Sequence, residues 1–269
     1  SDLYITLDNV QGNITFENVS FKYQADNNSA VEDLRLTIKP GEKVGILGRI
    51  GSGKSTMLKL ASGLYDTEKG NVTLDGVDMR QLDPNFLRDQ VLLLSQSPRL
   101  FLGTLRENMD LARTGSYSTD QDLLIALNRF GLDKIIRNHP RGLDMPLGED
   151  GLGLSGGQKQ IIALARMTLR NPKVVLLDEP TNDLDVETLG SLENALLAFP
   201  GCAVVVTHDR WFLDRVATHI LAWEGTEEHP DKWYWFEGNF EAYEKNKVER
   251  LGEAAANPHR VTHRKLTRD

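Results

Sequence analysis

The first part of the chain alternates apolar and polar residues, which is the pattern of strands with one buried face. Two such runs cover residues 14–23 and 31–48, and a Lys-Pro-Gly turn divides the second run into two strands. A glycine-rich stretch comes next, and the segment TMLKLASGLY after it has helical spacing. The segment NVTLDGVDMRQL predicts a hairpin around Asp75 and Gly76. The sequence therefore predicts a strand layer that leads through one strand into a loop and a helix.

The apolar spacing becomes helical between about residues 98 and 165, which predicts a helical subdomain. A continuous apolar run then covers residues 174–178, as is typical of a central strand in a parallel sheet. A further helix pattern and the strand CAVVVTHD follow, and this alternation predicts a parallel sheet covered by helices. We expect one α/β domain over residues 1–240, with the helical subdomain inserted into it, and a helical, basic tail over residues 241–269.

Composition narrows the class of protein. Of the 269 residues, 40% are hydrophobic and 26% charged, so the chain can bury a sizeable core. The net charge of −8 argues against broad binding to nucleic acid or anionic lipid. We expect no direct membrane insertion, because no apolar stretch could cross a bilayer and the N-terminus lacks a signal-peptide pattern. The single cysteine, Cys202, lies in an apolar strand pattern, so we expect buried packing and a cytoplasmic location, or the cytoplasmic face of a membrane if the chain serves a transporter.

Two further features have simple interpretations. The four tryptophans lack the spacing of a base-stacking platform, so we interpret them as packing residues: Trp211, Trp223, Trp233 and Trp235. The basic end of the tail could contact RNA phosphates, but a solvated terminus explains it as well.

The glycine-rich stretch matches the phosphate-binding pattern G-x-x-x-x-G-K-[ST] between a strand and a helix. It comprises Gly48, Arg49, Ile50, Gly51, Ser52, Gly53, Lys54 and Ser55, and Thr56 follows. Glycines let successive backbone N–H groups turn towards phosphates, and the helix N-terminus adds a positive dipole. We expect Lys54 to contact the β- and γ-phosphates of ATP, Ser55 to bind Mg²⁺ and Thr56 to reach the α-phosphate.

Two carboxylates stand at the end of the apolar run. Ligands of open α/β sheets bind at the carboxyl ends of strands, so we expect Asp178 to hold Mg²⁺, directly or through water. Glu179 follows and is the candidate general base for an attacking water. An Asp-Glu-Pro sequence also ends strands without any catalytic role. The phosphate loop upstream is what favours the catalytic interpretation.

The segment Leu154-Ser155-Gly156-Gly157-Gln158 resembles the signature motif of ATP-binding cassette (ABC) proteins. Ser155 and the two glycines open a helix whose N-terminus can present N–H groups to an anion. A helix cap followed by flexible glycines would look the same, but further motifs of the family follow in the expected order. The resemblance covers about residues 12–240. It implies a P-loop NTPase fold: an ABC cassette with a RecA-like parallel sheet core, an antiparallel β subdomain and a helical subdomain.

The resemblance assigns roles to four more positions. Tyr23 resembles the aromatic residue that stacks on adenine, and Gln96 the glutamine that contacts Mg²⁺ and senses a coupling partner. Asp185 belongs to a loop, Asn182-Asp-Leu-Asp185, that crosses the dimer interface in the family. His208 resembles the switch histidine that contacts the γ-phosphate.

Together these motifs imply an ATP hydrolase with ATP and Mg²⁺ as cofactors. Two copies would pair head-to-tail, and the signature of each copy would close over the ATP of the other. Mg²⁺ would be held by Ser55, Gln96 and Asp178, while Glu179, His208 and Lys54 act on water and the γ-phosphate. A lone copy lacks half of the charge-stabilising groups, so it would bind ATP but hydrolyse it slowly.

The two parts of the chain resemble different branches of the family. Residues 12–175, including LFLGTLRENM, resemble the nucleotide-binding domain of type I secretion and peptide exporters, which implies a membrane domain as partner. In exporters the position of residues 148–151 is a second coupling loop. Residues 176–269 resemble the ABC-F family of ribosome-associated ATPases, in particular the energy-dependent translational throttles; this implies a ribosome or RNA partner, the weaker of the two implications. Three alternatives therefore remain: an exporter motor domain, a translation-factor fragment, and a hybrid cassette that is engineered or naturally recombined. The hybrid is the simplest account of the sequence.

Overall fold

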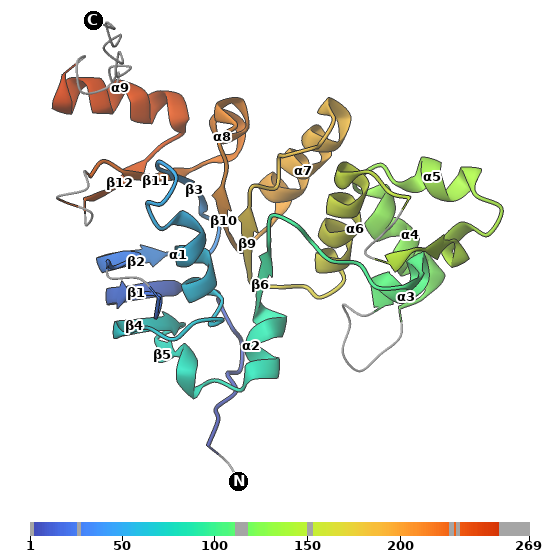
Figure 1. Cartoon of the computed structure of the whole chain (residues 1–269), viewed down its shortest axis with the longest axis horizontal. Coiled ribbons are helices and arrows are strands. Elements are labelled where there is room, and N and C mark those ends of the chain that lie inside the picture. The colour runs from blue at the N-terminus through green and yellow to red at the C-terminus, as the bar shows by residue number, and fades with distance from the viewer. Residues whose placement is uncertain are drawn as a thin grey trace, which may run out of the picture.

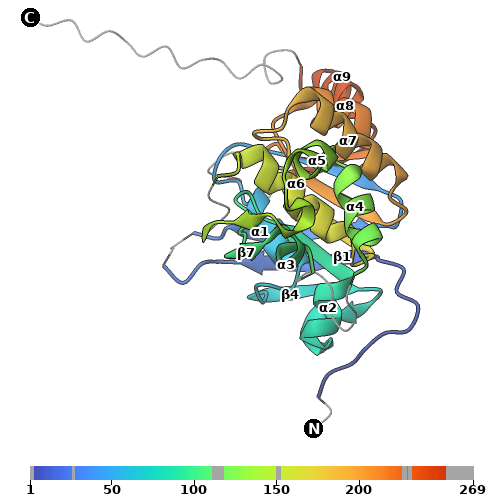
Figure 2. The same cartoon turned by 90° about the vertical axis from the view of Figure 1, so that its right-hand side faces the viewer.

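The computed structural model describes residues 3–25, 28–110, 118–149, 153–225, 229 and 232–252. Within these residues the strands form a large central sheet and a smaller antiparallel sheet, and helix α1 (Lys54–Ala61) packs between them (Figure 1). A group of helices lies on the other side of the central sheet (Figures 1 and 2). This layered arrangement is the predicted α/β fold.

The central sheet has the strand order β12-β11-β3-β10-β9-β6. Its strands are β3 (Lys43–Leu47), β6 (Val91–Leu94), β9 (Val174–Asp178), β10 (Cys202–Val206), β11 (His219–Trp223) and β12 (Trp233–Glu237). All pair in parallel except the edge strand β12, which runs antiparallel to β11. Every residue of β10 is buried because layers cover both faces of the sheet, and this explains its unbroken apolar sequence.

The antiparallel sheet has the order β2-β1-β4-β5. Its strands are β1 (Ile14–Phe21), β2 (Val31–Ile38), β4 (Lys69–Leu74) and β5 (Val77–Asp78). Asp75 and Gly76 join β4 to β5, and both have positive φ angles, 49° and 82°, as a tight hairpin turn requires. The predicted hairpin is therefore confirmed.

The helices beyond the central sheet lie together and face the viewer in Figure 2. They are α3 (Leu105–Asp110), α4 (Asp120–Asn128), α5 (Asp133–Asn138) and α6 (Gly156–Thr168). Two short strands, β7 (Gly103–Thr104) and β8 (Pro146–Leu147), pair beside them, and a 3₁₀ turn covers Gly142–Asp144. The helical pattern after residue 120 is divided at Gly131, whose φ of 78° ends the first helix before the second begins.

The remaining helices are α2 (Pro84–Gln90), α7 (Val186–Ala198), α8 (Arg210–Val216) and α9 (Phe240–Leu251), with a 3₁₀ turn at Met79–Gln81. Alternate residues of the strands divide the core: Leu176 faces the side of α1, and Leu177 faces α6, α7 and α8. Cys202 is fully buried, and burial raises the pKa of its thiol to about 12, so it is a packing residue as expected. Trp211 on α8 is 74% exposed, so its interpretation as a packing residue was wrong.

Two expectations fall outside the described residues in whole or in part. The basic end of the tail lies entirely beyond them, and so do the last two residues of the segment 148–151. Among the described helices, none combines the length and the apolar character that crossing a bilayer requires.

Candidate active site

The sheet register brings the predicted phosphate loop and the predicted carboxylates to one edge. Val206 at the end of β10 pairs with Ile46 of β3 on one side and with Asp178 of β9 on the other. The loop that follows β3, the carboxylates that end β9 and His208 after β10 therefore leave the sheet at neighbouring positions. Gln96 follows β6, whose Leu94 pairs with Leu177 of β9, so it leaves from the same edge and is exposed.

The phosphate loop runs from Gly48 to the start of α1. Gly51 and Gly53 have φ angles of 82° and 93°, which side chains other than glycine rarely adopt. A Cβ on Gly53 would also lie 2.3 Å from the backbone oxygen of Ala30. The hydroxyl of Ser52 is buried without a hydrogen-bond partner among the described residues. A buried hydroxyl without a partner is a feature that a bound phosphate would satisfy.

Lys54 lies at the first position of α1 and donates to the loop itself. Its Nζ contacts the carbonyl oxygen of Gly48 and lies 3.0 Å from that of Arg49. Burial lowers the pKa of Lys54, while the charges of Glu179 and Asp178 act in the opposite direction. The lysine therefore lies within electrostatic range of both carboxylates, as the predicted site requires.

Glu179 is held in an unusual backbone conformation directly after β9. Its φ is 48°, and its N–H donates to the carbonyl of Val206 at 2.7 Å. Its side chain is 11% exposed, and its Oε1 lies 3.3 Å from Nε2 of His208. Burial raises the pKa of Glu179, the charges of His208 and Lys54 lower it, and that of Asp178 raises it. Backbone strain and a raised pKa are both common in catalytic bases.

The signature residues cap helix α6. The Ser155 hydroxyl accepts from the N–H of Gln158 at 3.1 Å, and the Gln158 side chain accepts from the N–H of Ser155 at 3.0 Å. This reciprocal pair is a capping box, so Ser155 and Gln158 also have a structural role. Gly156 and Gly157 pack against Asp183 of the loop after β9, a contact that the sequence analysis missed.

Asp185 and Tyr23 have contacts within the chain. Asp185 caps α7 by accepting from the N–H of Thr188 at 2.7 Å, and this hydrogen bond lowers the pKa of its carboxyl. The hydroxyl of Tyr23 lies 2.9 Å from that of Thr56, and its ring contacts those of Phe21 and Tyr65. Thr56 is 6% exposed, and its hydroxyl, which we expect at the α-phosphate, lies next to that of Tyr23.

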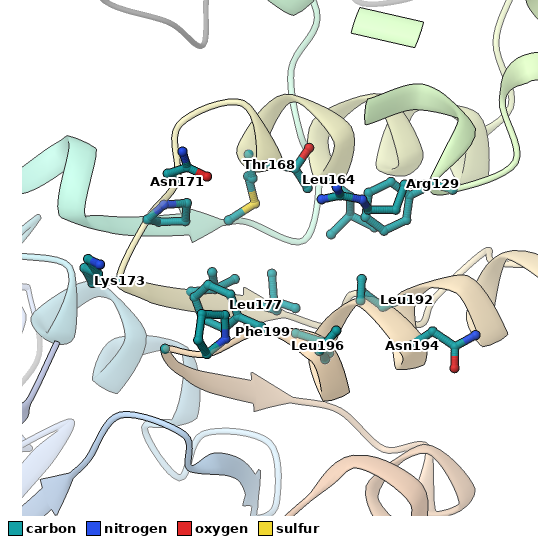
Figure 3. A pocket seen from close by; sticks show the side chains of 18 of the residues that line it. Arg129, Leu164, Thr168, Asn171, Lys173, Leu177, Leu192, Asn194, Leu196 and Phe199 are labelled. Carbon is teal, nitrogen blue, oxygen red and sulfur yellow. The ribbon is translucent and has the colours of Figure 1, made fainter. Parts of the chain in front are cut away.

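A cavity of about 970 Å³ lies at the opposite edge of the central sheet, between α6 and α7 (Figure 3). Apolar side chains such as Leu164, Leu192 and Leu196 line it, with Lys173 and Arg129 among its polar members. None of the residues predicted for catalysis, nucleotide binding or metal binding lines it. The predicted site residues therefore lie away from this large cavity, at the edge of the sheet where the parallel strands have their carboxyl ends.

The fold and the site together define a P-loop NTPase of the cassette type. The profile of the ABC transporter family matches residues 31–182, and the chain belongs to this family as an ABC-type ATPase domain. Members of the family bind ATP, and their nucleotide-binding domains dimerise.

Comparisons with individual proteins point to two branches. The energy-dependent translational throttle protein EttA of Mycobacterium tuberculosis is 43% identical over 258 residues, which cover 96% of this chain and 43% of that protein. The ABC transporter ATP-binding protein YwjA of Bacillus subtilis is 40% identical over 187 residues, 70% of this chain and 32% of that protein. Among solved structures, a bacterial Atm1-family ABC exporter with ATP bound matches 95% of this chain and 42% of its own, with a TM-score of 0.80 and 26% identity.

The chain is much shorter than the three proteins that it matches. It spans less than half of each of the three proteins. The alignment with the throttle protein covers 96% of the chain, so this likeness extends well beyond residues 176–269.

Proposed function

We propose that the chain binds Mg-ATP on its phosphate loop and hydrolyses it when two copies pair head-to-tail. The observation that carries the proposal is the gathering of Lys54, Glu179 and His208 at one edge of the central sheet, with Oε1 of Glu179 3.3 Å from Nε2 of His208. Lys54 approaches the phosphates as a point charge, and the loop N–H groups surround them.

The residues proposed for Mg²⁺ suit this ion. Ser55, Gln96 and Asp178 supply a hydroxyl, an amide and a carboxylate oxygen, and Mg²⁺ prefers hard oxygen ligands together with phosphate oxygens and water. Among the described residues, no three His, Cys, Asp or Glu side chains form a cluster that could hold a metal. The proposed Mg²⁺ site does not need such a cluster, because nucleotide oxygens would complete the ligands that the hydroxyl, the amide and the carboxylate supply. When bound, the ion would neutralise charge on the β- and γ-phosphates.

Hydrolysis requires Glu179 to accept a proton from water. The water oxygen forms a bond to the γ-phosphorus, the bond from that phosphorus to the β–γ bridging oxygen breaks, and ADP and inorganic phosphate leave. The largely buried carboxylate of Glu179 is positioned by its left-handed backbone and by His208. His208 is 68% exposed at its side chain, so it remains accessible to a γ-phosphate.

A second copy completes the site because the signature lies away from its own phosphate loop. Helix α1 belongs to the core on one face of the central sheet, and α6 belongs to the core on the other face. Figure 1 shows the two helices on opposite sides of the sheet. A γ-phosphate on one copy is therefore reached by the Ser155 end of α6 from another copy, as in the family resemblance.

Two cellular settings follow from the comparisons. The exporter match has a TM-score of 0.80 and suggests a motor domain that works with a membrane domain. The throttle relative is 43% identical over 96% of the chain and favours a role in translation, with the ribosome as partner. Co-sedimentation of the Glu179→Gln variant with ribosomes in Mg-ATP distinguishes the two settings. Binding to ribosomes that persists at physiological salt supports the role in translation. Absence of binding across the salt range favours the exporter motor domain.

The ATPase rate per subunit, measured against protein concentration, tests the proposed function. We expect the rate per subunit to rise with concentration, because two copies form the site, and to vanish in Glu179→Gln. A rate that is independent of concentration would argue against paired copies. Absence of Mg-ATP binding would overturn the proposal as a whole.

A further inference from the structure

Trp223, which belongs to none of the predicted motifs, lies beside the phosphate loop. It ends β11, whose Ala222 pairs with Leu47, the residue directly before Gly48. A Cβ on Gly48 would lie 3.1 Å from Cβ of Trp223, so the first glycine of the loop packs closely on this side chain. The guanidinium of Arg49 lies over the indole ring, 4.6 Å from its centroid. The first two residues of the loop therefore rest on one tryptophan.

The same two residues hold Lys54. Its ammonium group donates to the carbonyls of Gly48 and Arg49. The position of these carbonyls determines where the ammonium lies, and Trp223 contacts both residues that carry them. The indole thus acts on the lysine indirectly, through the loop backbone.

The residue after Trp223 is fixed by the C-terminal helix. The side chain of Glu224 is 8% exposed, and Nη2 of Arg250 on α9 lies 2.8 and 3.2 Å from its two carboxylate oxygens. The guanidinium of Arg250 lies 3.4 Å from the ring centroid of Tyr234 on β12. The N–H of Glu224 also donates to the carbonyl of Lys232 at 2.8 Å. Two segments close to the C-terminal end of the described chain therefore hold the backbone next to Trp223.

We propose that Trp223 is a positioning residue for the phosphate loop, and that the Glu224–Arg250 pair transmits the position of α9 to it. The proposal rests on the proposed nucleotide binding at this loop. The reason is geometric: phosphate binding needs several loop N–H groups and one ammonium in a fixed arrangement, and small displacements weaken all of these contacts together. A partner that moves α9 would change nucleotide affinity without touching the nucleotide.

Calorimetric titration with Mg-ADP tests the first step, because this ligand engages the loop without the γ-phosphate that closes a pair of copies. We expect Trp223→Leu to weaken binding by about tenfold, and Trp223→Phe, which keeps an aromatic ring under Arg49, to restore most of the affinity. Arg49→Ala changes an exposed loop residue and should weaken binding without risk to folding. Trp235→Leu is the matched control, since Trp235 belongs to the same hairpin but stacks on His219.

Double-mutant cycles test whether the residues act as one unit. Arg49→Ala should have little further effect in the Trp223→Leu background. Arg250→Met should weaken Mg-ADP binding in the otherwise native chain, but it should not weaken binding further in the Trp223→Leu variant. Equal affinity of Trp223→Leu, Arg49→Ala and the native chain would overturn the inference, as would strictly additive effects. If the native chain itself fails to bind Mg-ADP, the proposed function fails first, so the two failures are distinguishable.

Discussion

The backbone oxygen of Asp183 occupies the space that a side chain on Gly157 would need: a Cβ built on Gly157 would lie 2.4 Å from it. Asp183 has a φ of 64°, so the loop after β9 turns sharply to reach this position. Its carboxylate lies beside Gly156, where a Cβ would be 3.1 Å from Oδ2. Gly157 is therefore required for contact with the neighbouring loop of the same chain, in addition to any phosphate that it binds, and Gly156 leaves room for the Asp183 carboxylate.

Gly157→Ala should separate the signature from that loop. Real Cβ atoms do not approach a backbone oxygen this closely, so the start of α6 or the loop must shift, at a cost of about 1–3 kcal/mol in the free energy of unfolding. Because both segments belong to the proposed dimer interface, the ATPase rate should fall more than Mg-ADP affinity. Urea unfolding and steady-state kinetics measure the two effects.

Gly190→Ala provides the matched control. Gly190 lies within α7, and a Cβ there would meet nothing within 4 Å. Alanine should stabilise this helix by roughly 0.5–1 kcal/mol and leave the ATPase rate unchanged. If Gly157→Ala behaves like Gly190→Ala, the contact with Asp183 has no energetic importance.

The fold could be predicted from local patterns because each pattern had one physical explanation. The continuous run in β9 and β10 indicated a sheet buried on both faces, and the sheet order places the expected loop and carboxylates at one edge. Motif spacing then supplied Lys54, Asp178 and Glu179 as candidates.

The contacts between elements could not be predicted in the same way. Nothing in the sequence near Trp223 indicates that it lies under Arg49, because this contact depends on which strand pairs with β3. A helix cap at Ser155 was already one interpretation of the sequence, and the structure adds that Gln158 completes it as a capping box. The exposure of Trp211 follows from the orientation of α8, which a short helical segment does not determine.

Glu179→Gln should bind Mg-ATP and fail to hydrolyse it. The amide keeps the size of the side chain but cannot accept the proton of water, and loss of a general base typically costs about 10²–10⁴ in rate. ATP should then hold two copies together, because hydrolysis no longer releases them. Light scattering after gel filtration in Mg-ATP should give twice the mass found in Mg-ADP. A variant with the native ATPase rate would remove Glu179 from the role of base.

The raised pKa of Glu179 predicts a dependence of stability on pH. Burial is the main cause, and it favours the protonated carboxyl in the folded chain relative to the ordinary value of 4.5. This contribution to stability is complete below pH 4.5 and is lost as the pH rises through the raised pKa. The Glu179→Gln variant lacks the ionisation, so its stability relative to the native chain should increase as the pH rises from 4.5 through the raised pKa of Glu179. Urea unfolding without nucleotide at several pH values measures the difference, and a difference that stays constant would contradict the assignment.

Tyr23 has two separable contacts, and its substitutions can distinguish them. Tyr23→Phe removes the hydroxyl that lies 2.9 Å from Thr56 and keeps the ring beside Phe21 and Tyr65, so it should cost about 1 kcal/mol of stability. Tyr23→Leu also removes the ring. If the ring stacks on adenine, ATP affinity should fall by about tenfold in Tyr23→Leu and by less than twofold in Tyr23→Phe, since stacking contributes roughly 1–3 kcal/mol per base. Calorimetry with Mg-ATP and with Mg-triphosphate decides the matter, because triphosphate has no base and its binding should be equal in both variants. An equal loss of affinity for both ligands would mean that Tyr23 acts through Thr56 and the phosphate loop instead of the base.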